Sequence, residues 1–256
     1  MQSQAAGSGR PMALVGGGLT GWKSWEVHQA RLAATRRVAR LQPLSVQLGL
    51  EDRTLPPDYS VALESRALAA ALDPDPVDLV AWSYGAVIAL DFALGAPGRV
   101  RTLTLIEPPA FWVLEATGAG DDQTRRESDE LRALHREMTA GVSEAQLARF
   151  IARAGLLPPG ERADQLPAWP NWVEHRRSLR TGEAGWLHRD SVDRLRAFDR
   201  PTLLVTGIGT AHLLRRIIDG LASAMPRATL LELPGAHAPH MVAMDDFLTR
   251  LAEHAS

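Results

Sequence analysis

Short apolar segments that alternate with helix-like stretches constrain the fold of this 256-residue chain more than any other feature. They are rich in Leu, Val and Ile with little polar alternation, as is typical of parallel strands buried on both faces. Strand and helix alternate, and this order predicts a doubly wound, mostly parallel α/β sheet. The predicted strands are residues 12–16, 37–42, 77–83, 100–107, 201–207 and 228–233.

One long interval breaks this alternation. Residues 111–198 contain helical stretches and polar turns but no convincing strand. We therefore expect one α/β core, formed by residues 11–110 and 199–256, with residues 111–198 inserted as an α-helical cap. The first ten residues carry no apolar pattern, and we predict that residues 1–10 are disordered.

Composition excludes several classes of function. The net charge is −2 and Lys23 is the only lysine, so nothing indicates a nucleic-acid surface. The chain has no cysteine, which excludes disulfides and thiolate catalysis. The N-terminal residues lack the apolar core of a signal peptide, and no apolar stretch is long enough to span a bilayer. We expect a cytoplasmic protein without membrane or nucleic-acid partners.

The first apolar segment runs into a glycine-rich stretch, ALVGGGLTGWKSW at residues 13–25, that has two interpretations. Gly16, Gly18 and Gly21 match the G-x-G-x-x-G pattern of dinucleotide-binding turns. The stretch can instead be a strand-to-helix turn whose backbone N–H groups hold a developing oxyanion. A dinucleotide site expects an acidic residue about 20 positions later, where this chain reads RRVARLQPL. Its arginines could still face a phosphate, but we favour the oxyanion interpretation.

Ser83 lies between an apolar strand and an apolar helix, in LVAWSYGAVIALDFAL at residues 79–94. This is the strand–turn–helix context of a nucleophile elbow, G-x-S-x-G. Ala81 and Gly85 are the small residues that flank the serine, and Ala81 departs from the usual first glycine. A buried serine in a tight turn would give the same short pattern, but the flanking strand and helix favour catalysis.

A candidate base follows the last predicted strand, in LELPGAHAPHM at residues 231–241. His237 leaves this strand at the sheet edge where Ser83 is expected, so the two side chains can meet. His240 begins the next predicted helix and is expected to cap or to pack. A histidine pair can also bind a metal, but no further ligand lies beside it, and we predict no metal site.

These motifs, in this order, resemble the α/β-hydrolase fold superfamily from about residue 11 to the C-terminus. AWSYGA is similar to the family's elbow, LPGAHAPH to its histidine loop, and residues 111–198 to its helical cap. The resemblance implies an oxyanion hole formed by the backbone N–H groups of Gly18 and Tyr84, with Gly16 where the family usually has histidine. It also implies an N-terminal hairpin, for which too few residues precede Met12. We therefore expect six strands, parallel throughout.

The third member of a catalytic triad departs from the family pattern. The family commonly places an Asp after the penultimate strand, but no carboxylate lies between Gly207 and Asp219. Glu107 ends the strand that follows the nucleophile helix, a position that resembles that of zearalenone-type lactonases and some dehalogenases. Glu107 could instead cap the turn through backbone amides. We predict that it orients His237.

Tryptophans cluster around these motifs and in the predicted cap, which indicates an aromatic, apolar pocket. The residues predicted to line it are Leu19, Trp22, Trp82, Trp112, Trp169, Trp172 and Trp186.

The function expected from these features is a serine hydrolase, without cofactor or metal, that cleaves an ester or lactone of a hydrophobic small molecule through an acyl-enzyme. Fold analogy alone leaves two alternatives open. The first is a non-hydrolytic enzyme of the same fold, namely a lyase, a cyclase or a cofactor-free oxygenase. The second is a ligand-binding receptor. An uncovered edge strand could also pair with a second copy in a homodimer.

Overall fold

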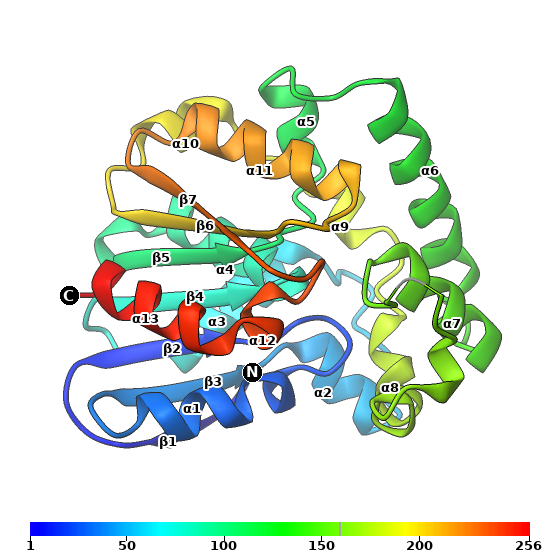
Figure 1. Cartoon of the computed structure of the whole chain (residues 1–256), viewed down its shortest axis with the longest axis horizontal. Helices are drawn as coiled ribbons and strands as arrows, with labels where there is room; N and C mark the ends of the chain where they lie inside the picture. The colour runs from blue at the N-terminus through cyan, green and yellow to red at the C-terminus, as the bar shows by residue number, and fades with distance from the viewer. Residues whose placement is uncertain (159) are drawn as a thin grey trace.

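A single sheet occupies the centre of the molecule (Figure 1). The computed structural model describes residues 1–158 and 160–256. In these residues seven strands pair in the order β1-β3-β2-β4-β5-β6-β7, and all neighbours are parallel except β1 and β3. The strands are β1 (Gln2–Ala6), β2 (Pro11–Val15), β3 (Arg37–Gln42), β4 (Val77–Trp82), β5 (Val100–Ile106), β6 (Thr202–Gly207) and β7 (Ala228–Leu233).

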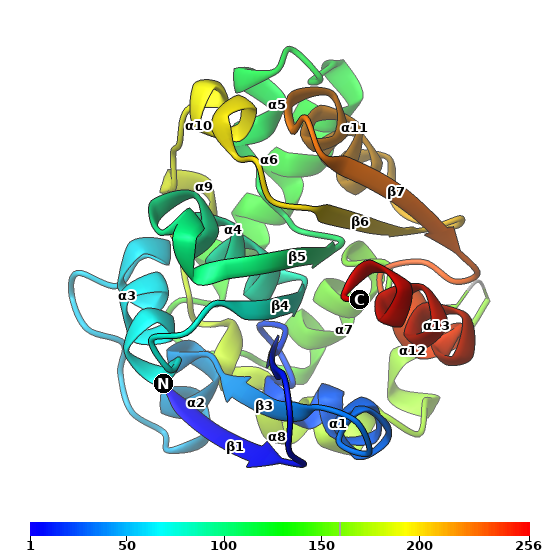
Figure 2. The same ribbon diagram turned by 90° about the vertical axis from the view of Figure 1, so that its left-hand side faces the viewer.

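Helices cover both faces of this sheet, as Figure 2 shows. One face packs against α3, α4 and α11, and the other against α1 and α13. The helices are α1 (Glu26–Leu32), α2 (Leu44–Leu50), α3 (Val61–Ala71), α4 (Tyr84–Gly95), α5 (Trp112–Ala116), α6 (Asp122–Glu137), α7 (Glu144–Arg153), α8 (Trp169–His175), α9 (Ala184–Leu187), α10 (Val192–Ala197), α11 (His212–Ala224), α12 (Pro239–Val242) and α13 (Met244–His254).

The central strands are apolar at successive positions because their two faces contribute to two separate cores. On β2, Ala13 and Val15 pack in the cluster that includes α4, whereas Met12 and Leu14 pack in the cluster that includes α13. Side chains along a strand alternate between faces, so a sheet covered on both sides needs apolar residues at every position. The predicted α/β fold class is confirmed, and the six predicted strands match β2 to β7.

The predictions of a disordered N-terminus and of a six-stranded, wholly parallel sheet were wrong. Residues 2–6 form β1, which pairs antiparallel with β3 and covers its edge. All five residues of β1 are exposed, so the strand has no apolar pattern by which a sequence could reveal it. Polar contacts fix it instead: Gln4 accepts hydrogen bonds from Gln29 Nε2 at its carbonyl and from Arg40 at its side chain, at 2.9 and 2.6 Å.

Helices α6, α7 and α8 lie beyond the carboxyl ends of the strands, whereas α5 and α10 pack beside α11 (Figure 1). Helices α5 to α10 all fall between β5 and β6 in the chain. Helices α6, α7 and α8 share a small hydrophobic cluster, which also includes Leu19 from the glycine-rich loop. Of the helices in the described residues, none combines the length and the apolarity that crossing a membrane requires.

Two buried histidines, His28 and His240, lie between α1, α12 and α13. His240 is fully buried between Trp25, Trp82 and Phe247, with ring centroids 4.8 to 5.8 Å apart. Neither of its ring nitrogens has a hydrogen-bond partner in the described residues. Burial, followed by the nearby imidazoles of His28 and His237, holds its pKa well below 6.5. The ring therefore packs as a neutral aromatic group.

We expect the free energy of unfolding to decrease as the pH falls from 8 to 5, and less steeply in a His240→Phe variant. Below pH 6.5 a proton binds at this residue only in the unfolded chain, because the folded-state pKa is depressed. This linkage destabilises the protein by up to about 1.4 kcal/mol per pH unit for one such histidine. Urea denaturation at pH 8, 6.5 and 5 measures it, and pH 8 isolates the packing effect. Parallel pH dependences in the two proteins would contradict the assignment.

Candidate active site

Ser83 occupies a sharp turn between β4 and α4. Its φ of 54° lies in the left-handed region, which costs free energy for a residue other than glycine. The turn holds because the backbone on both sides is closely packed. A Cβ at Gly85 would lie 2.3 Å from the Gly16 carbonyl oxygen, so only glycine fits there. Ser83 N–H donates to the Ile106 carbonyl at 2.9 Å, which ties the turn to β5.

His237 reaches Ser83 from the loop between β7 and α12. Its Nε2 lies 2.9 Å from Ser83 Oγ, within hydrogen-bond distance. The imidazole is 4% exposed, and its loop is held from two sides. The Trp82 indole donates to the His237 carbonyl at 2.7 Å, and the His237 N–H donates to the Gly155 carbonyl of the insertion at 3.3 Å. The core and the insertion therefore both position this histidine.

Glu107 follows β5 and is completely buried beside His237. Its Oε2 lies 3.5 Å from His237 Nδ1, on the side of the ring opposite Ser83. The carboxylate accepts hydrogen bonds from the Thr206 hydroxyl at 2.6 Å, the Gly207 N–H at 2.9 Å and the Thr210 hydroxyl. The three residues predicted as a triad are thus adjacent in the order Ser83, His237, Glu107.

The loop after β2 lies against this turn. Gly17 and Gly18 approach the side chains of Trp82, Ser83 and Tyr84, since a Cβ added to either glycine would meet one of them at 3.0 to 3.1 Å. In residues 1–158 and 160–256, no group accepts a hydrogen bond from the backbone N–H of Gly18 or Tyr84. Tyr84 also begins α4, where the helix dipole favours negative charge.

A family model described as the alpha/beta hydrolase family matches residues 13–250, which include all of these elements. The chain belongs to the alpha/beta hydrolase family. The serine elbow and the histidine loop that carry the resemblance in the sequence both fall within the matched residues, and their side chains meet in the structure.

Three comparisons illustrate how far the similarity extends. The chain is 38% identical over 106 residues to a 2-hydroxy-6-oxo-2,4-heptadienoate hydrolase of Pseudomonas putida, covering 39% of this chain and 38% of that relative. It is 30% identical over 190 residues to the pimeloyl-(acyl-carrier protein) methyl ester esterase of Chromobacterium violaceum, covering 73% of each. An alpha/beta hydrolase structure from Sphaerobacter thermophilus matches with a TM-score of 0.73 at 25% identity, over 100% of this chain and 96% of that one.

A cavity of about 300 Å³ adjoins Ser83 and His237 on the side of the insertion. Most of its lining side chains are apolar or aromatic. Phe111 and Trp186 stack in this wall, with ring centroids 4.4 Å apart and planes 11° apart. The site of this alpha/beta hydrolase can therefore receive a small molecule with an apolar portion.

Three of the residues predicted to line the pocket line this cavity: Leu19, Trp82 and Trp186. The other four do not: Trp22, Trp112, Trp169 and Trp172. Trp112 is buried in the core cluster that includes α4 and α11. Trp169 and Trp172 pack against the insertion's own cluster. Aromatic content predicts that a side chain is buried but not which apolar region buries it.

The sequence gives no indication that His135 of α6 lies in the cavity wall. Its ring lies between Phe150 and Trp186 in the cavity wall, with centroids 5.6 and 5.0 Å away. Burial lowers the pKa of His135 to about 4, so the imidazole is neutral near pH 7. The helical pattern of α6 is strongly polar overall, and nothing in it distinguishes this histidine from its exposed neighbours.

A buried polar relay holds the first residue of α4. The Tyr84 hydroxyl lies 3.0 Å from the Tyr59 hydroxyl, which donates to Glu64 Oε1 at 2.9 Å. Glu64 also accepts the N–H groups of Leu44 and Ser45 at the start of α2. Burial raises the pKa of both Glu64 and Tyr84. The relay thus connects the turn at Ser83 to α2 and α3.

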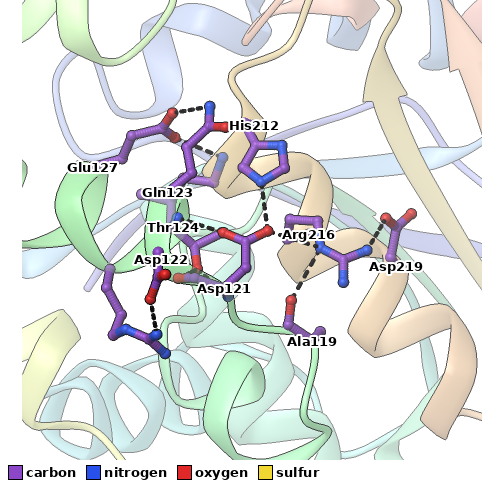
Figure 3. A network of polar contacts seen from close by, with 11 residues as sticks. Ala119, Asp121, Asp122, Gln123, Thr124, Glu127, His212, Arg216 and Asp219 are labelled. Carbon is purple, nitrogen blue, oxygen red and sulfur yellow. Dashed lines mark hydrogen bonds and ion pairs between the residues drawn. The ribbon is translucent and has the colours of Figure 1, made fainter.

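Polar contacts also connect the insertion to the core, as Figure 3 shows at the start of α6 and α11. His212 Nε2 donates to Asp121 Oδ2 at 2.8 Å, and the Leu213 N–H donates to Glu127 Oε2 at 2.8 Å. The Thr124 N–H, followed by the His212 imidazole, lowers the pKa of Asp121 to about 2. Glu127 and Leu213 line the cavity, so these contacts fix part of its wall.

Within the described part of the chain, one group of side chains has the spacing of metal ligands: Asp91, His188 and Asp190. Asp190 already accepts two hydrogen bonds from Arg194, at 2.8 and 2.9 Å. A guanidinium in this position supplies the positive charge that a cation would otherwise bring. We assign no metal to this group.

We expect Gly16→Ala, and more so Gly16→His, to destabilise the protein although histidine is common there in the family. A Cβ at Gly16 would lie 2.1 Å from the Gly21 backbone carbon and 2.6 Å from Trp22 N. Overpacking of this kind costs about 1 to 3 kcal/mol or more. Gly98→Ala is the matched control, since a Cβ there meets nothing within 4 Å. Thermal denaturation with equal melting temperatures for the Gly16→Ala and Gly98→Ala variants would contradict this.

Proposed function

We propose that this chain is a serine hydrolase that cleaves a carboxylic ester or lactone of a hydrophobic small molecule without a cofactor. The observation that carries the proposal is the 2.9 Å contact between His237 Nε2 and Ser83 Oγ at the wall of an apolar cavity. A serine becomes nucleophilic when an adjacent base can accept its proton. Glu107, on the far side of the imidazole, is the proposed third member of the triad.

In the proposed reaction, Ser83 Oγ attacks the substrate carbonyl carbon while its proton moves to His237 Nε2. The carbonyl oxygen becomes negatively charged and accepts hydrogen bonds from the N–H groups of Gly18 and Tyr84. The imidazolium then protonates the leaving alcohol oxygen, and the acyl group stays on Ser83. Water attacks this acyl-enzyme with His237 again as the base, which releases the acid and restores the serine.

The apolar cavity wall supports a substrate with a hydrophobic acyl or alcohol group. The names of the relatives support hydrolysis: one is a methyl ester esterase, and another is a hydrolase named for an oxo-dienoate. A test panel therefore needs methyl esters, esters of longer acids, lactones and a 6-oxo-dienoate. The panel also separates the alternatives, since a lyase, cyclase, oxygenase or receptor of this fold would release no carboxylic acid from these compounds.

We expect Ser83→Ala to abolish turnover of any active ester or lactone and to prevent labelling by a fluorophosphonate probe. Loss of the nucleophile removes the acyl-enzyme route. Ser178→Ala is the matched control for labelling. Ser178 lines the same cavity, but its hydroxyl is 2.6 and 3.0 Å from the carbonyls of His175 and Leu19. The proposal is wrong if Ser83→Ala hydrolyses the substrate at the wild-type rate.

We expect Glu107→Gln to lower kcat by a factor on the order of 10³ to 10⁴ while the protein stays folded. The amide cannot stabilise the imidazolium, and it favours the wrong imidazole tautomer. Steady-state kinetics with circular dichroism as a folding control measures this. A folded variant with most of the wild-type kcat would remove Glu107 from the triad and leave the roles of Ser83 and His237 untouched.

A further inference from the structure

We infer that Thr206 and Thr210 are positioning residues of the catalytic triad, which act on His237 through Glu107. The inference rests on the proposed function. It concerns the loop after β6, where the family commonly has the triad acid and this chain has none. In this structure the two hydroxyls at the end of β6 and in this loop instead hold the carboxylate that comes from β5.

The hydrogen bonds to Glu107 divide between its two oxygens. Oε1 accepts from the Thr206 hydroxyl at 2.6 Å and from the Gly207 N–H at 2.9 Å. Oε2 accepts from the Thr210 hydroxyl and faces His237 Nδ1 at 3.5 Å. All three donors belong to the end of β6 and the loop that follows it. The carboxylate is thus fixed from the neighbouring strand rather than from its own.

A buried carboxylate needs such donors. Glu107 is fully buried, so solvent does not stabilise its carboxylate. Its φ of 49° also lies in the left-handed region, which costs free energy for a residue other than glycine. Hydrogen bonds to a carboxylate favour its charged form, which is the form that can stabilise an imidazolium. They also restrict the side chain to the rotamer that brings Oε2 to Nδ1.

The same loop contacts the loop that carries the histidine. A Cβ at Gly207 would lie 2.2 Å from the Ala236 carbonyl oxygen, and the Gly209 N–H donates to the Gly235 carbonyl at 2.8 Å. The Thr206–Thr210 segment therefore holds both the carboxylate and the backbone next to His237. Of these contacts, the two hydroxyls are the ones that a substitution can remove without adding bulk.

Thr210→Val tests the inference because it removes the hydroxyl and keeps the branched shape. A hydrogen bond to a charged group is worth about 10- to 100-fold in an equilibrium or a rate, and we expect kcat to fall by that factor with KM unchanged. Loss of this donor destabilises the pair of neutral His237 and Glu107 carboxylate more than the pair of imidazolium and carboxylate. The acid limb of the kcat/KM profile should therefore move to higher pH. Thr210→Ser, which keeps the hydroxyl, should restore both values.

Thr104→Val is the control. Thr104 is a buried threonine on β5 whose hydroxyl has no hydrogen-bond partner in the described residues. We expect wild-type kcat and an unchanged pH profile from it. Thr206→Val provides a second test of the inference, since its hydroxyl bonds the other carboxylate oxygen.

A double variant separates this inference from the proposed function. If Thr210 acts through Glu107, then Thr210→Val should change kcat little once Glu107→Gln is present. Equal losses in the wild-type and Glu107→Gln backgrounds would overturn the inference, as would folded Thr210→Val and Thr206→Val proteins with wild-type kcat and pH profile. If Glu107→Gln alone keeps its activity, the proposed triad fails instead.

Discussion

The close approach of two backbone segments, the glycine-rich loop after β2 and the first turn of α4, is the constraint on which the rest of the site depends. Gly16 and Gly85 meet where no Cβ fits. Gly17 and Gly18 consequently pack against the turn. The same contact holds the backbone of Ser83 in its left-handed conformation. The serine hydroxyl and the free N–H groups consequently face the same cavity. Gly16 is also closely packed against its own loop, since a Cβ there would lie 2.1 Å from the Gly21 backbone carbon.

The position of the proposed acid follows from sheet geometry. Neighbouring parallel strands lie about 4.8 Å apart, so a carboxylate from the end of either β5 or β6 can reach the same imidazole. This chain has the proposed acid, Glu107, directly after β5, and hydroxyls on the β6 side at Thr206 and Thr210. The proposed acid therefore lies beside His237 although it follows β5 rather than β6. A pattern search limited to the usual position would miss the proposed triad.

Features that depend on burial in the sheet could be predicted from the sequence, because a strand covered on both faces must be apolar at every position. The elbow and the histidine loop were also predictable, since parallel strands end at a common edge. Edge strand β1 was not, because polar contacts rather than apolar burial hold it. The cavity wall was predictable only in part. Trp112 and Trp186 are equally hydrophobic, yet Trp112 packs in the core cluster and Trp186 lines the cavity, and this difference depends on how the insertion folds.

The insertion and the core contribute differently to the site. The proposed reacting groups all lie on core strands and their loops, whereas Phe150, Trp186 and His135 of the cavity wall belong to the insertion. The insertion has its own hydrophobic cluster, which includes Leu19 beside the proposed oxyanion hole. Helices α6 and α7 contribute both to this cluster and, through His135 and Phe150, to the cavity wall, so substitutions in them can reshape the cavity. Leu19 is one of the residues where the two parts meet, so its packing couples the shape of the cavity to the loop that carries Gly18.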